Sequence, residues 1–336
     1  QEEVLAHHPK VDVAPIFSLR NGLINEVIGA AYDYDIYDEV FFADVKDQEF
    51  SANLQALRAA FPGRRISITS GTQDNSLAIL SVRSANHPVE FYIYDIKNKQ
   101  LSYLLNASPW LKAEQLAQTQ AIFYKSRDGL DIHAILTLPN NKEAKNLPLI
   151  MLPHGGPHGP RDYLDYDSDA KVLAQHGYAV LQPNFRGSGG FGRSFLQAGY
   201  QNWGTTMIDD MTDGVLHLVK EGIVDQNRVC AYGGSYGGYA ALMSAVREPD
   251  LYKCTVGFVG VFDLNLMYTD GDIPQRKSGI NYLEMAIGRD QQRLDAQSPI
   301  KHLDKLKAPV FIIHGKEDQR VPIIHADRLR AELEKR

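Results

Sequence analysis

The chain of 336 residues is longer than one hydrophobic core usually supports, so we expect two domains. Its hydrophobic content of 44% and charged content of 23% are typical of a soluble globular protein, and no run of about eighteen apolar residues predicts a membrane span. The net charge of −6, with no cluster of lysine and arginine, argues against a nucleic-acid partner.

The first part of the sequence, residues 1–119, predicts short β-strands separated by turns. The turn residues TQDN, ANHP and KNKQ separate the strand-like runs, and residues 51–61 predict one helix that Pro62 and Gly63 end. Strands at this spacing suit a meander, as in a propeller blade or a sandwich. Because one meander cannot cover its own faces and edges, we expect residues 1–119 to be the last part of a larger β-domain. The expected strands are RISITSG, SLAILSVRS, EFYIYDI and LSYLL.

From residue 120 to residue 336, apolar strands alternate with helices. Residues 121–139 predict two strands around the turn Asp128-Gly129, and residues 147–156 predict a buried strand that runs into glycines. This alternation predicts an α/β domain with a mostly parallel sheet and helices on both faces. Further strands are expected within residues 178–190, 228–234, 254–261 and 308–315, and helices at residues 170–177, 205–222, 237–249 and 325–335.

The two cysteines, Cys230 and Cys254, are too few for a disulfide framework and both lie in apolar, strand-like runs. We expect them to be buried free thiols. They indicate little about the compartment, for which the cytoplasm is the first expectation and the periplasm the alternative. The chain begins with Gln1 and ends in a charged helical segment, so we expect both ends to be internal to a longer protein, and the lack of a signal peptide is uninformative.

Ser235 lies in GGSYG, residues 233–237, which matches the pattern G-x-S-x-G. The motif stands between a predicted strand and a predicted helix, where the serine would leave the strand on a tight turn and present its Oγ at the end of the sheet. Glycines at the flanking positions remove Cβ atoms that would clash. The helix that follows aims N–H groups at the reaction centre, so the backbone N–H of Tyr236 is an expected oxyanion donor. The alternative is a glycine-rich turn with an idle serine.

The segment HGGPHG, residues 154–159, follows a predicted strand and is the candidate for the second oxyanion element. We expect Gly156 to offer a backbone donor there. His154 either lines the oxyanion hole or only positions the loop.

Asp318, in the loop HGKEDQRVP after a late strand, is the expected triad acid, because this fold places the acid after the serine in chain order. Asp263 follows a strand much sooner after the serine and is the weaker candidate, and Glu317 is expected to point elsewhere. The one histidine after Asp318 is His325, at the start of a predicted helix, where a helix-cap or surface role is expected. The catalytic histidine is therefore expected beyond Arg336.

The motifs HGGPHG, NFRGSGGFG, NWG, GGSYGGYAAL and HGKEDQRVP occur in the order and at the spacing seen in the prolyl oligopeptidase family of serine peptidases. Residues 120–336 resemble its acylaminoacyl-peptidase and dipeptidyl-peptidase-like branch, and residues 61–105 resemble the last propeller blade of these enzymes. The resemblance implies an N-terminal β-propeller that caps an α/β-hydrolase domain. It also implies short peptide substrates, because the cap excludes folded chains.

By this resemblance Ser235 is the nucleophile and Asp318 the triad acid. His154 stands where several relatives carry an oxyanion-hole tyrosine, which leaves its role open. Arg320 matches an arginine that holds a substrate carbonyl near the scissile bond, and its alternative is a surface ion pair beside the acid loop.

The two remaining family motifs are expected to be structural, with Arg186 anchoring its loop and Trp203 packing in the core. The expected reaction is acyl transfer through an acyl-enzyme, which needs no metal or organic cofactor, and no cysteine–histidine metal cluster is present in the sequence. The expected partners are short peptides, and the oligomeric state, monomer or homo-oligomer, is left open. The alternatives are an esterase or lipase on the same fold and a catalytically incomplete fragment.

Overall fold

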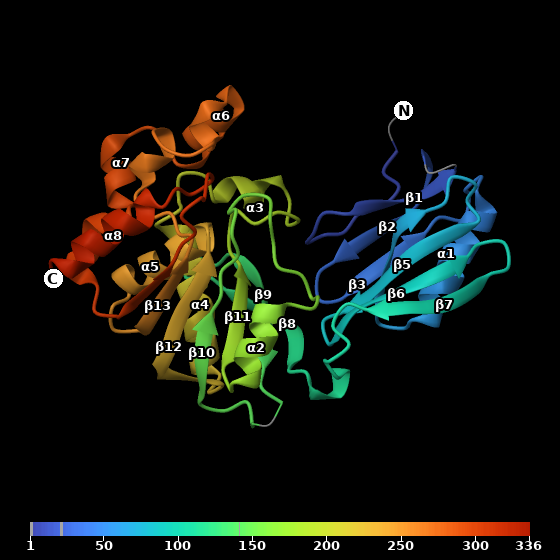
Figure 1. Cartoon of the computed structure of the whole chain (residues 1–336), viewed down its shortest axis with the longest axis horizontal. Helices are drawn as coiled ribbons and strands as arrows, with labels where there is room; N and C mark the ends of the chain where they lie inside the picture. Colours follow the sequence, from blue (N-terminus) through green and yellow to red (C-terminus); the bar gives the residue numbers. More distant parts are fainter. Residues whose placement is uncertain (1–2, 21–22, 141) are drawn as a thin grey trace. The chain divides into compact units, whose positions relative to one another are not determined.

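The computed structural model describes nearly the whole chain, namely residues 3–20, 23–140 and 142–336. The chain divides into two compact units (Figure 1). Unit 1 comprises Gln1–Ala121 and Tyr163–Lys171, and unit 2 comprises Ile122–Asp162 and Val172–Arg336. The sequence-based division places residues 163–171 in the second domain, whereas the structure groups them with the first 121 residues.

In its described residues, unit 1 contains two antiparallel sheets and the α-helix α1, which contacts β1 and β4, and strand β8 (Gln118–Lys125) and helix α2 (Ser168–Gln175) lie partly in this unit. The second sheet is a meander in chain order, so the predicted strands and the predicted helix are confirmed. The Asp47 carboxylate accepts a hydrogen bond from the Phe50 N–H at the start of α1, and Gly63, at φ 72°, follows its end. The elements are β1 (Ala14–Arg20), β2 (Leu23–Asp33), β3 (Tyr37–Phe41), α1 (Gln48–Ala60), β4 (Arg65–Gly71), β5 (Leu77–Ser84), β6 (His87–Asp95), β7 (Gln100–Asn106) and the 3₁₀-helix η1 (Ala113–Gln115).

A seven-stranded sheet in the order β14-β13-β12-β10-β11-β9-β8 forms the centre of unit 2. The strands from β11 through β10, β12 and β13 to β14 pair in parallel, and β9 pairs antiparallel with β11, which confirms the predicted mostly parallel sheet. The strands are β8 (Gln118–Lys125), β9 (Asp131–Leu138), β10 (Leu147–Met151), β11 (Ala179–Asn184), β12 (Val224–Gly234), β13 (Tyr252–Phe258) and β14 (Val310–Ile313).

Two of the helices that cover this sheet, α4 and α5, contact each other and pack against β12. Helix α4 carries apolar residues at helical spacing, among them Met207, Met211 and Val215, and these are buried in the main core. The helices are α2 (Ser168–Gln175), α3 (Arg193–Ala198), α4 (Thr206–Lys220), α5 (Tyr236–Arg247), α6 (Lys277–Ala286), α7 (Gln291–Ala296) and α8 (Ile324–Glu334), with the 3₁₀-helices η2 (Leu264–Tyr268), η3 (Ile273–Gln275) and η4 (Pro299–Lys305).

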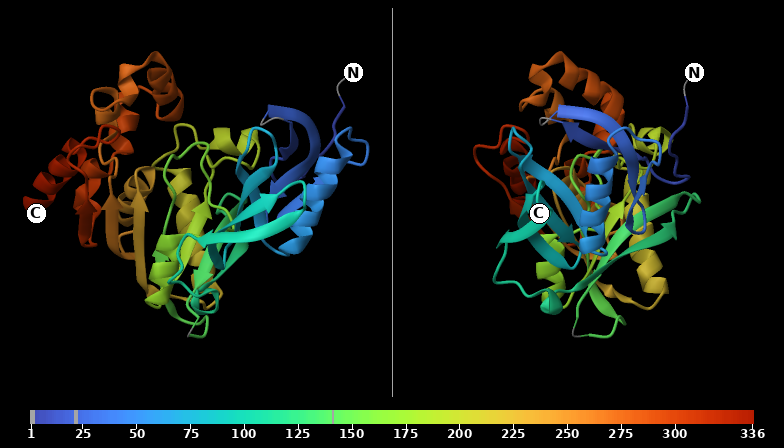
Figure 2. Two further views of the ribbon diagram at one scale, coloured as in Figure 1. Left: turned by 45° about the vertical axis from the view of Figure 1, so that its right-hand side comes forward. Right: turned by 90° about the vertical axis from the view of Figure 1, so that its right-hand side faces the viewer.

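Helices α3, α6 and α7 were not predicted, and α6 and α7 extend beyond one end of the sheet in every view (Figures 1 and 2). Of the helices within the described residues, none combines the length and the apolar character needed to cross a bilayer.

The strand order places a crevice at the carboxyl ends of β10 and β12. These two strands are neighbours, but the chain continues from β10 to β11 on one side and from β12 to β13 on the other. Connections that diverge in this way leave the space above the two strands open, which is where open α/β sheets bind ligands. The loop after β10 and the turn at Ser235 therefore meet at one place.

Cys230 and Cys254 are joined by a disulfide, so the expectation of two free thiols is wrong in this structure. The two residues are register partners on the parallel neighbours β12 and β13, with Cα atoms 4.7 Å apart. The sequence shows two separate apolar runs and not their pairing, which explains the error. The bond ties the strand that leads to Ser235 to its neighbour.

Candidate active site

Ser235 stands on the tight turn between β12 and α5. Its backbone lies at φ 57° and ψ −119°, a region that residues with a side chain rarely adopt. The Ser235 N–H donates to the Phe258 carbonyl at 2.9 Å, and the Tyr239 N–H donates to the Ser235 carbonyl at 3.1 Å. These bonds hold the strained turn in place, while the Ser235 hydroxyl has no hydrogen-bond partner among the residues that the structure describes.

The glycines around Ser235 are required by close backbone contacts. A Cβ on Gly233 would lie 2.5 Å from the backbone of Gly237, and a Cβ on Gly237 would overlap the carbonyl oxygen of Pro153. The predicted reason for glycine at both flanking positions is thereby confirmed. The overlap with Pro153 also shows how closely the loop after β10 approaches the turn.

A cavity of about 490 Å³ opens beside Ser235. Gly156, Tyr236 and Arg320 share its lining, so the structure brings four of the predicted site residues together. One wall is apolar and the rim is charged. The apolar wall contains Trp203, Val261, Met267, Ile273 and Tyr282, and the rim contains Asp272, Arg276 and Arg320.

The ring nitrogens of His154 both point into the surrounding loops. Nδ1 lies 2.7 Å from the Gly155 carbonyl oxygen and Nε2 lies 2.8 Å from Ser188 Oγ, while the ring stacks on Phe185 at 4.4 Å. Burial lowers the pKa of His154 to about 4, so the ring is neutral near pH 7. Because a carbonyl only accepts, Nδ1 carries the proton, and Nε2 shares the one Ser188 hydroxyl proton with the Phe185 carbonyl, which lies 2.7 Å from Ser188 Oγ. The arrangement favours a loop-positioning role over a donor in the oxyanion hole.

Asp318 lies in the loop after β14, and backbone groups fix one of its oxygens. Its Oδ1 accepts from the N–H groups of Arg320 and Val321, both at 2.9 Å. No described residue donates to Oδ2. Asp263 is engaged differently, because its carboxylate caps η2 by accepting from the Asn265 N–H at 3.1 Å.

His158 lines the cavity and was not singled out from the sequence, although it is the second histidine of HGGPHG. Its Nε2 accepts from the Trp203 indole N–H at 3.1 Å, and burial lowers its pKa to about 4. Trp203 is 2% exposed, as expected for a packing residue, but it also lines the cavity. The signal that could have found His158 is its position within the same glycine-rich loop as His154 and Gly156.

His325 is the second residue of α8, as predicted, but the expected helix-cap or surface role is wrong. The side chain is only 1% exposed, and its Nδ1 accepts from the Phe262 N–H at 3.2 Å. Burial lowers its pKa to about 4. His314, just after β14, contacts the Val321 carbonyl through Nε2 at 2.6 Å. Both histidines are therefore held by backbone groups.

Arg320 forms a two-point ion pair with Asp272 at the cavity rim. Its Nε and Nη2 lie 2.7 and 2.9 Å from the two carboxylate oxygens. Arg186, by contrast, is buried and anchors its loop as predicted, with Nε donating to Asp210 at 2.8 Å and Nη1 2.8 Å from Asp128. Within the described residues no group of three or more His, Cys, Asp or Glu side chains is placed to hold a metal ion.

A family model and several known proteins match this chain. The model of the prolyl oligopeptidase family matches residues 164–336. Dipeptidyl aminopeptidase BIII of Pseudoxanthomonas mexicana is 35% identical over 297 residues, covering 85% of this chain and 43% of that protein. The acylamino-acid-releasing enzyme of Rattus norvegicus is 32% identical over 202 residues, covering 57% of this chain and 27% of that protein.

The solved structures agree with the fold. An acylaminoacyl peptidase from Pyrococcus horikoshii is 25% identical with a TM-score of 0.66, covering 77% of this chain and 41% of that chain. A prolyl endopeptidase structure has a TM-score of 0.74 at 18% identity, covers 98% of this chain and 47% of that chain, and shows the fold alone. The chain spans less than half the length of each of these proteins. The mostly parallel sheet and these neighbours confirm the predicted α/β-hydrolase class, and the family match over half of the sequence shows that the chain belongs to the prolyl oligopeptidase family.

Proposed function

We propose that the chain carries the nucleophile and the triad acid of a serine peptidase that cleaves short peptides. The observation that carries the proposal is the turn at Ser235, where a strained serine stands between a strand and a helix and lines a cavity. Strained backbone at such a place is a feature of catalytic sites, because it fixes the reacting atom. Ser235 Oγ attacks the peptide carbonyl carbon, the amine leaves with a proton, and water then hydrolyses the acyl-enzyme.

In this proposal, two backbone N–H groups stabilise the negative charge that develops on the substrate oxygen. One is the N–H of Tyr236, which is the first residue of α5. The other is the N–H of Gly156, in the loop after β10. Support for this loop comes from Gly155, where an added Cβ would lie 3.4 Å from Ser235 Cβ. His154 would hold the loop in place through Ser188.

We propose that a histidine oriented by Asp318 takes the Ser235 proton. Asp318 is suited to this role because Oδ1 is fixed by two backbone N–H groups and Oδ2 can accept from an imidazole. His154, His158 and His325 already hold other partners. The general base is therefore proposed to be a histidine that the described residues do not supply, as expected beyond Arg336. The chain by itself would then keep only the residual catalysis of binding and oxyanion stabilisation, about 10³–10⁴-fold over water.

The substrate class rests on the relatives and on unit 1. The matched proteins are named as a dipeptidyl aminopeptidase and an acylamino-acid-releasing enzyme, and we propose a similar short peptide substrate here. The four-stranded meander β4–β7 has the strand order of a propeller blade. We propose that residues 1–119 are the last part of a β-propeller that screens substrates for a catalytic domain of residues 120–336.

Arg320 is proposed to hold a substrate carbonyl at the cavity rim. Its Nε and Nη2 contact Asp272, which leaves Nη1 as a donor without a partner in the described part of the chain. The ion pair with Asp272 would orient the guanidinium for this contact. The alternative, a plain surface ion pair, predicts that Arg320→Gln leaves KM unchanged, whereas the proposal predicts a higher KM.

Comparison of peptide and ester substrates tests the proposed function. The chain is assayed with a dipeptidyl p-nitroanilide, an N-acetyl-amino-acid p-nitroanilide and p-nitrophenyl butyrate, with Ser235→Ala as the blank. We expect slow, Ser235-dependent release from at least one of the two anilides. Release from the ester alone would contradict the peptidase and support an esterase or lipase, and no Ser235-dependent release from any of them would support a catalytically incomplete fragment.

A further inference from the structure

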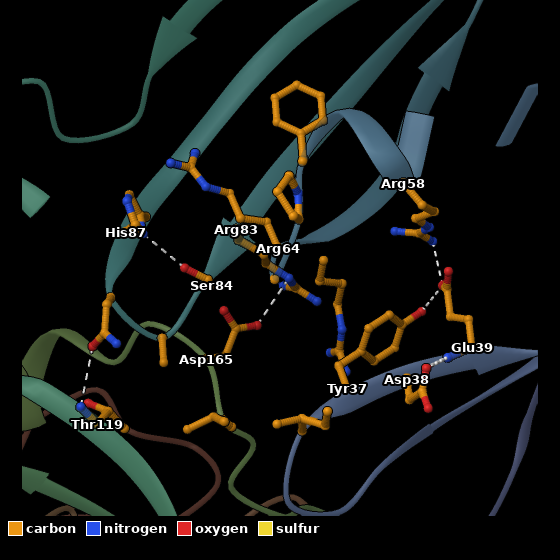
Figure 3. A pocket seen from close by; sticks show the side chains of 18 of the residues that line it. Tyr37, Asp38, Glu39, Arg58, Arg64, Arg83, Ser84, His87, Thr119 and Asp165 are labelled. Atoms are coloured by element: carbon orange, nitrogen blue, oxygen red, sulfur yellow. Dashed lines mark hydrogen bonds and ion pairs between the residues drawn. The ribbon is translucent and has the colours of Figure 1, made fainter. Parts of the chain in front are cut away.

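A second cavity, of about 600 Å³, lies within unit 1 and shares no lining residue with the Ser235 cavity (Figure 3). Its walls come from Ile36 and strand β3, from the end of α1 through the start of β4, and from the end of β5 through the start of β6, with Thr119, Leu164 and Asp165 completing the lining. In Figure 3 the Arg58–Glu39 pair stands across the cavity from the His87–Ser84 pair.

Four arginines line this cavity, and each forms an ion pair with a carboxylate of the described residues. Their side chains are partly buried, between 18% and 37% exposed, so their interactions are less screened than those of surface arginines. The pairs are Arg58–Glu39 at 2.7 Å, Arg64–Glu90 at 2.6 Å, Arg83–Asp165 at 3.0 Å and Arg65–Asp33.

Two of these arginines keep most of their donors unused. Toward the described part of the chain, Arg64 donates through Nη1 to Glu90 and through no other nitrogen, although a guanidinium carries five N–H groups. Arg83 Nε lies near Asp165 Oδ2 without the alignment of a hydrogen bond, and no described residue accepts from its two terminal nitrogens. Planar guanidinium edges with free N–H groups match the two oxygens of a carboxylate.

Asn86 adds a neutral donor whose orientation is fixed. Its Oδ1 accepts from Lys171 Nζ at 3.0 Å and from the Thr119 N–H at 3.3 Å. Lys171 is buried, and its other hydrogen bonds go to the Ala117 carbonyl and Thr119 Oγ1, so this end of the amide is held. The Nδ2 end of the Asn86 amide is left as a donor for the cavity, which Asn86 lines.

The remaining charges favour one carboxylate over a more highly charged anion. Each of the four guanidinium groups is paired with its own carboxylate, and Asp38 adds a fifth carboxylate as Lys171, bonded to Asn86, adds a fifth cation, so the charges are largely balanced. Burial lowers the pKa of His87, and the neutral ring adds no positive charge near pH 7. A near-neutral site binds through hydrogen-bond geometry, so a singly charged planar anion suits it better than phosphate.

We infer that this cavity binds the carboxylate of a short peptide, or of a similar small organic acid, through Arg64, Arg83 and the Asn86 amide. The inference stands on unit 1 alone and does not depend on the proposed peptidase reaction. Two further partly buried arginines complete the wall. Arg65 stacks 4.0 Å from the centre of the Tyr37 ring, and Arg58 is held by its ion pair with Glu39.

The test measures binding of N-acetyl-Ala-Ala and of its C-terminal amide to the chain carrying Ser235→Ala, by ligand-observed NMR or calorimetry, with inorganic phosphate as a third probe. We expect the free acid to bind at least about tenfold more tightly than the amide, as for hydrogen bonds to a charged group. Arg64→Gln and Arg83→Gln should each remove the preference for the acid over the amide. Arg83→Lys should weaken this preference, because lysine keeps the positive charge but lacks the two parallel N–H donors of a guanidinium.

The matched control is Arg289→Gln, which removes an exposed arginine from its pair with Glu284 in unit 2 and should leave the difference intact. Circular dichroism and Tm show whether each variant is folded, and binding is compared only among folded ones. Equal binding of acid and amide, or tighter binding of phosphate, would overturn the inference. So would a difference that survives Arg83→Gln and Arg64→Gln but disappears in Arg320→Gln, because the acid would then occupy the Ser235 cavity.

Discussion

Ser235 combines two properties that can be separated by substitution. Its positive φ is strained for any residue with a Cβ, and glycine relieves that strain. We expect Ser235→Gly to have a free energy of unfolding about 1 kcal/mol higher than Ser235→Ala, while both lose all reaction at this position. Urea unfolding of the two variants checks this, and an alanine variant as stable as the glycine variant would show that the turn is not strained.

Single residues were predictable from sequence where a local motif decides their place. Ser235 and its glycines follow from the strand–turn–helix setting, and the contacts of Gly233 and Gly237 are the ones expected. His154 was not predictable, because its partners Ser188 and Phe185 belong to the loop after another strand. A motif states which residues are neighbours in the chain, but hydrogen bonds between loops depend on the folded sheet.

At the scale of elements, the bond between β12 and β13 is a testable part of the sheet. Cys230 and Cys254 are 24 residues apart, and closing a loop of that length in the unfolded chain corresponds to about 3 kcal/mol of stability. We expect the Cys230→Ser, Cys254→Ser double variant to lose about that much in urea unfolding. Ellman's reagent should detect no free thiol in the denatured parent protein until the protein is reduced. Two reactive thiols in the unreduced, denatured protein would contradict the bond.

The buried ion pair between Arg186 and Asp210 connects the loop after β11 to helix α4. Asp210 is fully buried and Arg186 is 9% exposed, so removing one partner leaves the other with an unpaired charge away from water. We expect Arg186→Met to lower the free energy of unfolding by about 3–5 kcal/mol. Arg289→Met, at an exposed pair, should change it by less than about 1 kcal/mol. Similar losses in both variants would show that burial does not govern this pair.

The apolar strands and the long helices were predicted from the sequence, whereas several short helices were not. The strands of the parallel sheet and helix α4 carry long apolar patterns that survive in the structure. Helices α6 and α7 lie between β13 and β14 in the chain and have only 10 and 6 residues, so each offers few turns over which a helical pattern can be recognised. Helix α6 supplies the cavity wall with Tyr282, which no strand or long-helix pattern indicates.

At the scale of the whole molecule, buried histidines make stability depend on pH. Burial lowers the pKa of His154, His158 and His325 to about 4, against 6.5 for an unburied ring. Between these values the unfolded chain binds more protons than the folded one, so stability is full above pH 6.5 and is lost as the pH falls toward 4. A shift of this size corresponds to at most about 3 kcal/mol per histidine.

His325 is the histidine to test, because it is buried and lies outside the cavity lining. Urea unfolding of the parent and of His325→Asn at several pH values between 7 and 4.5 should give a shallower loss of stability in the variant. The exposed His176 provides the control, because His176→Gln should leave the slope unchanged. Equal slopes for the parent and His325→Asn would show that His325 does not resist protonation.

The division of the chain was predictable only in part. A change from turn-separated strands to alternating strands and helices marks the point near residue 120. Nothing in the local pattern of residues 163–171 indicates that they group with unit 1. The structure supplies the reason, because Lys171 places its hydrogen bonds on Asn86, Ala117 and Thr119, which the sequence separates from it by long stretches.

The central claim is that Ser235 is a nucleophile whose general base, a histidine, is not among the described residues. Fluorophosphonate labelling of this chain tests it most directly, with the adduct located by peptide mass spectrometry. The account predicts a single, slowly formed adduct on Ser235, accelerated by added imidazole and absent from Ser235→Ala. Fast labelling that imidazole does not accelerate would contradict the missing base, and an adduct on any other residue in place of Ser235 would contradict the nucleophile.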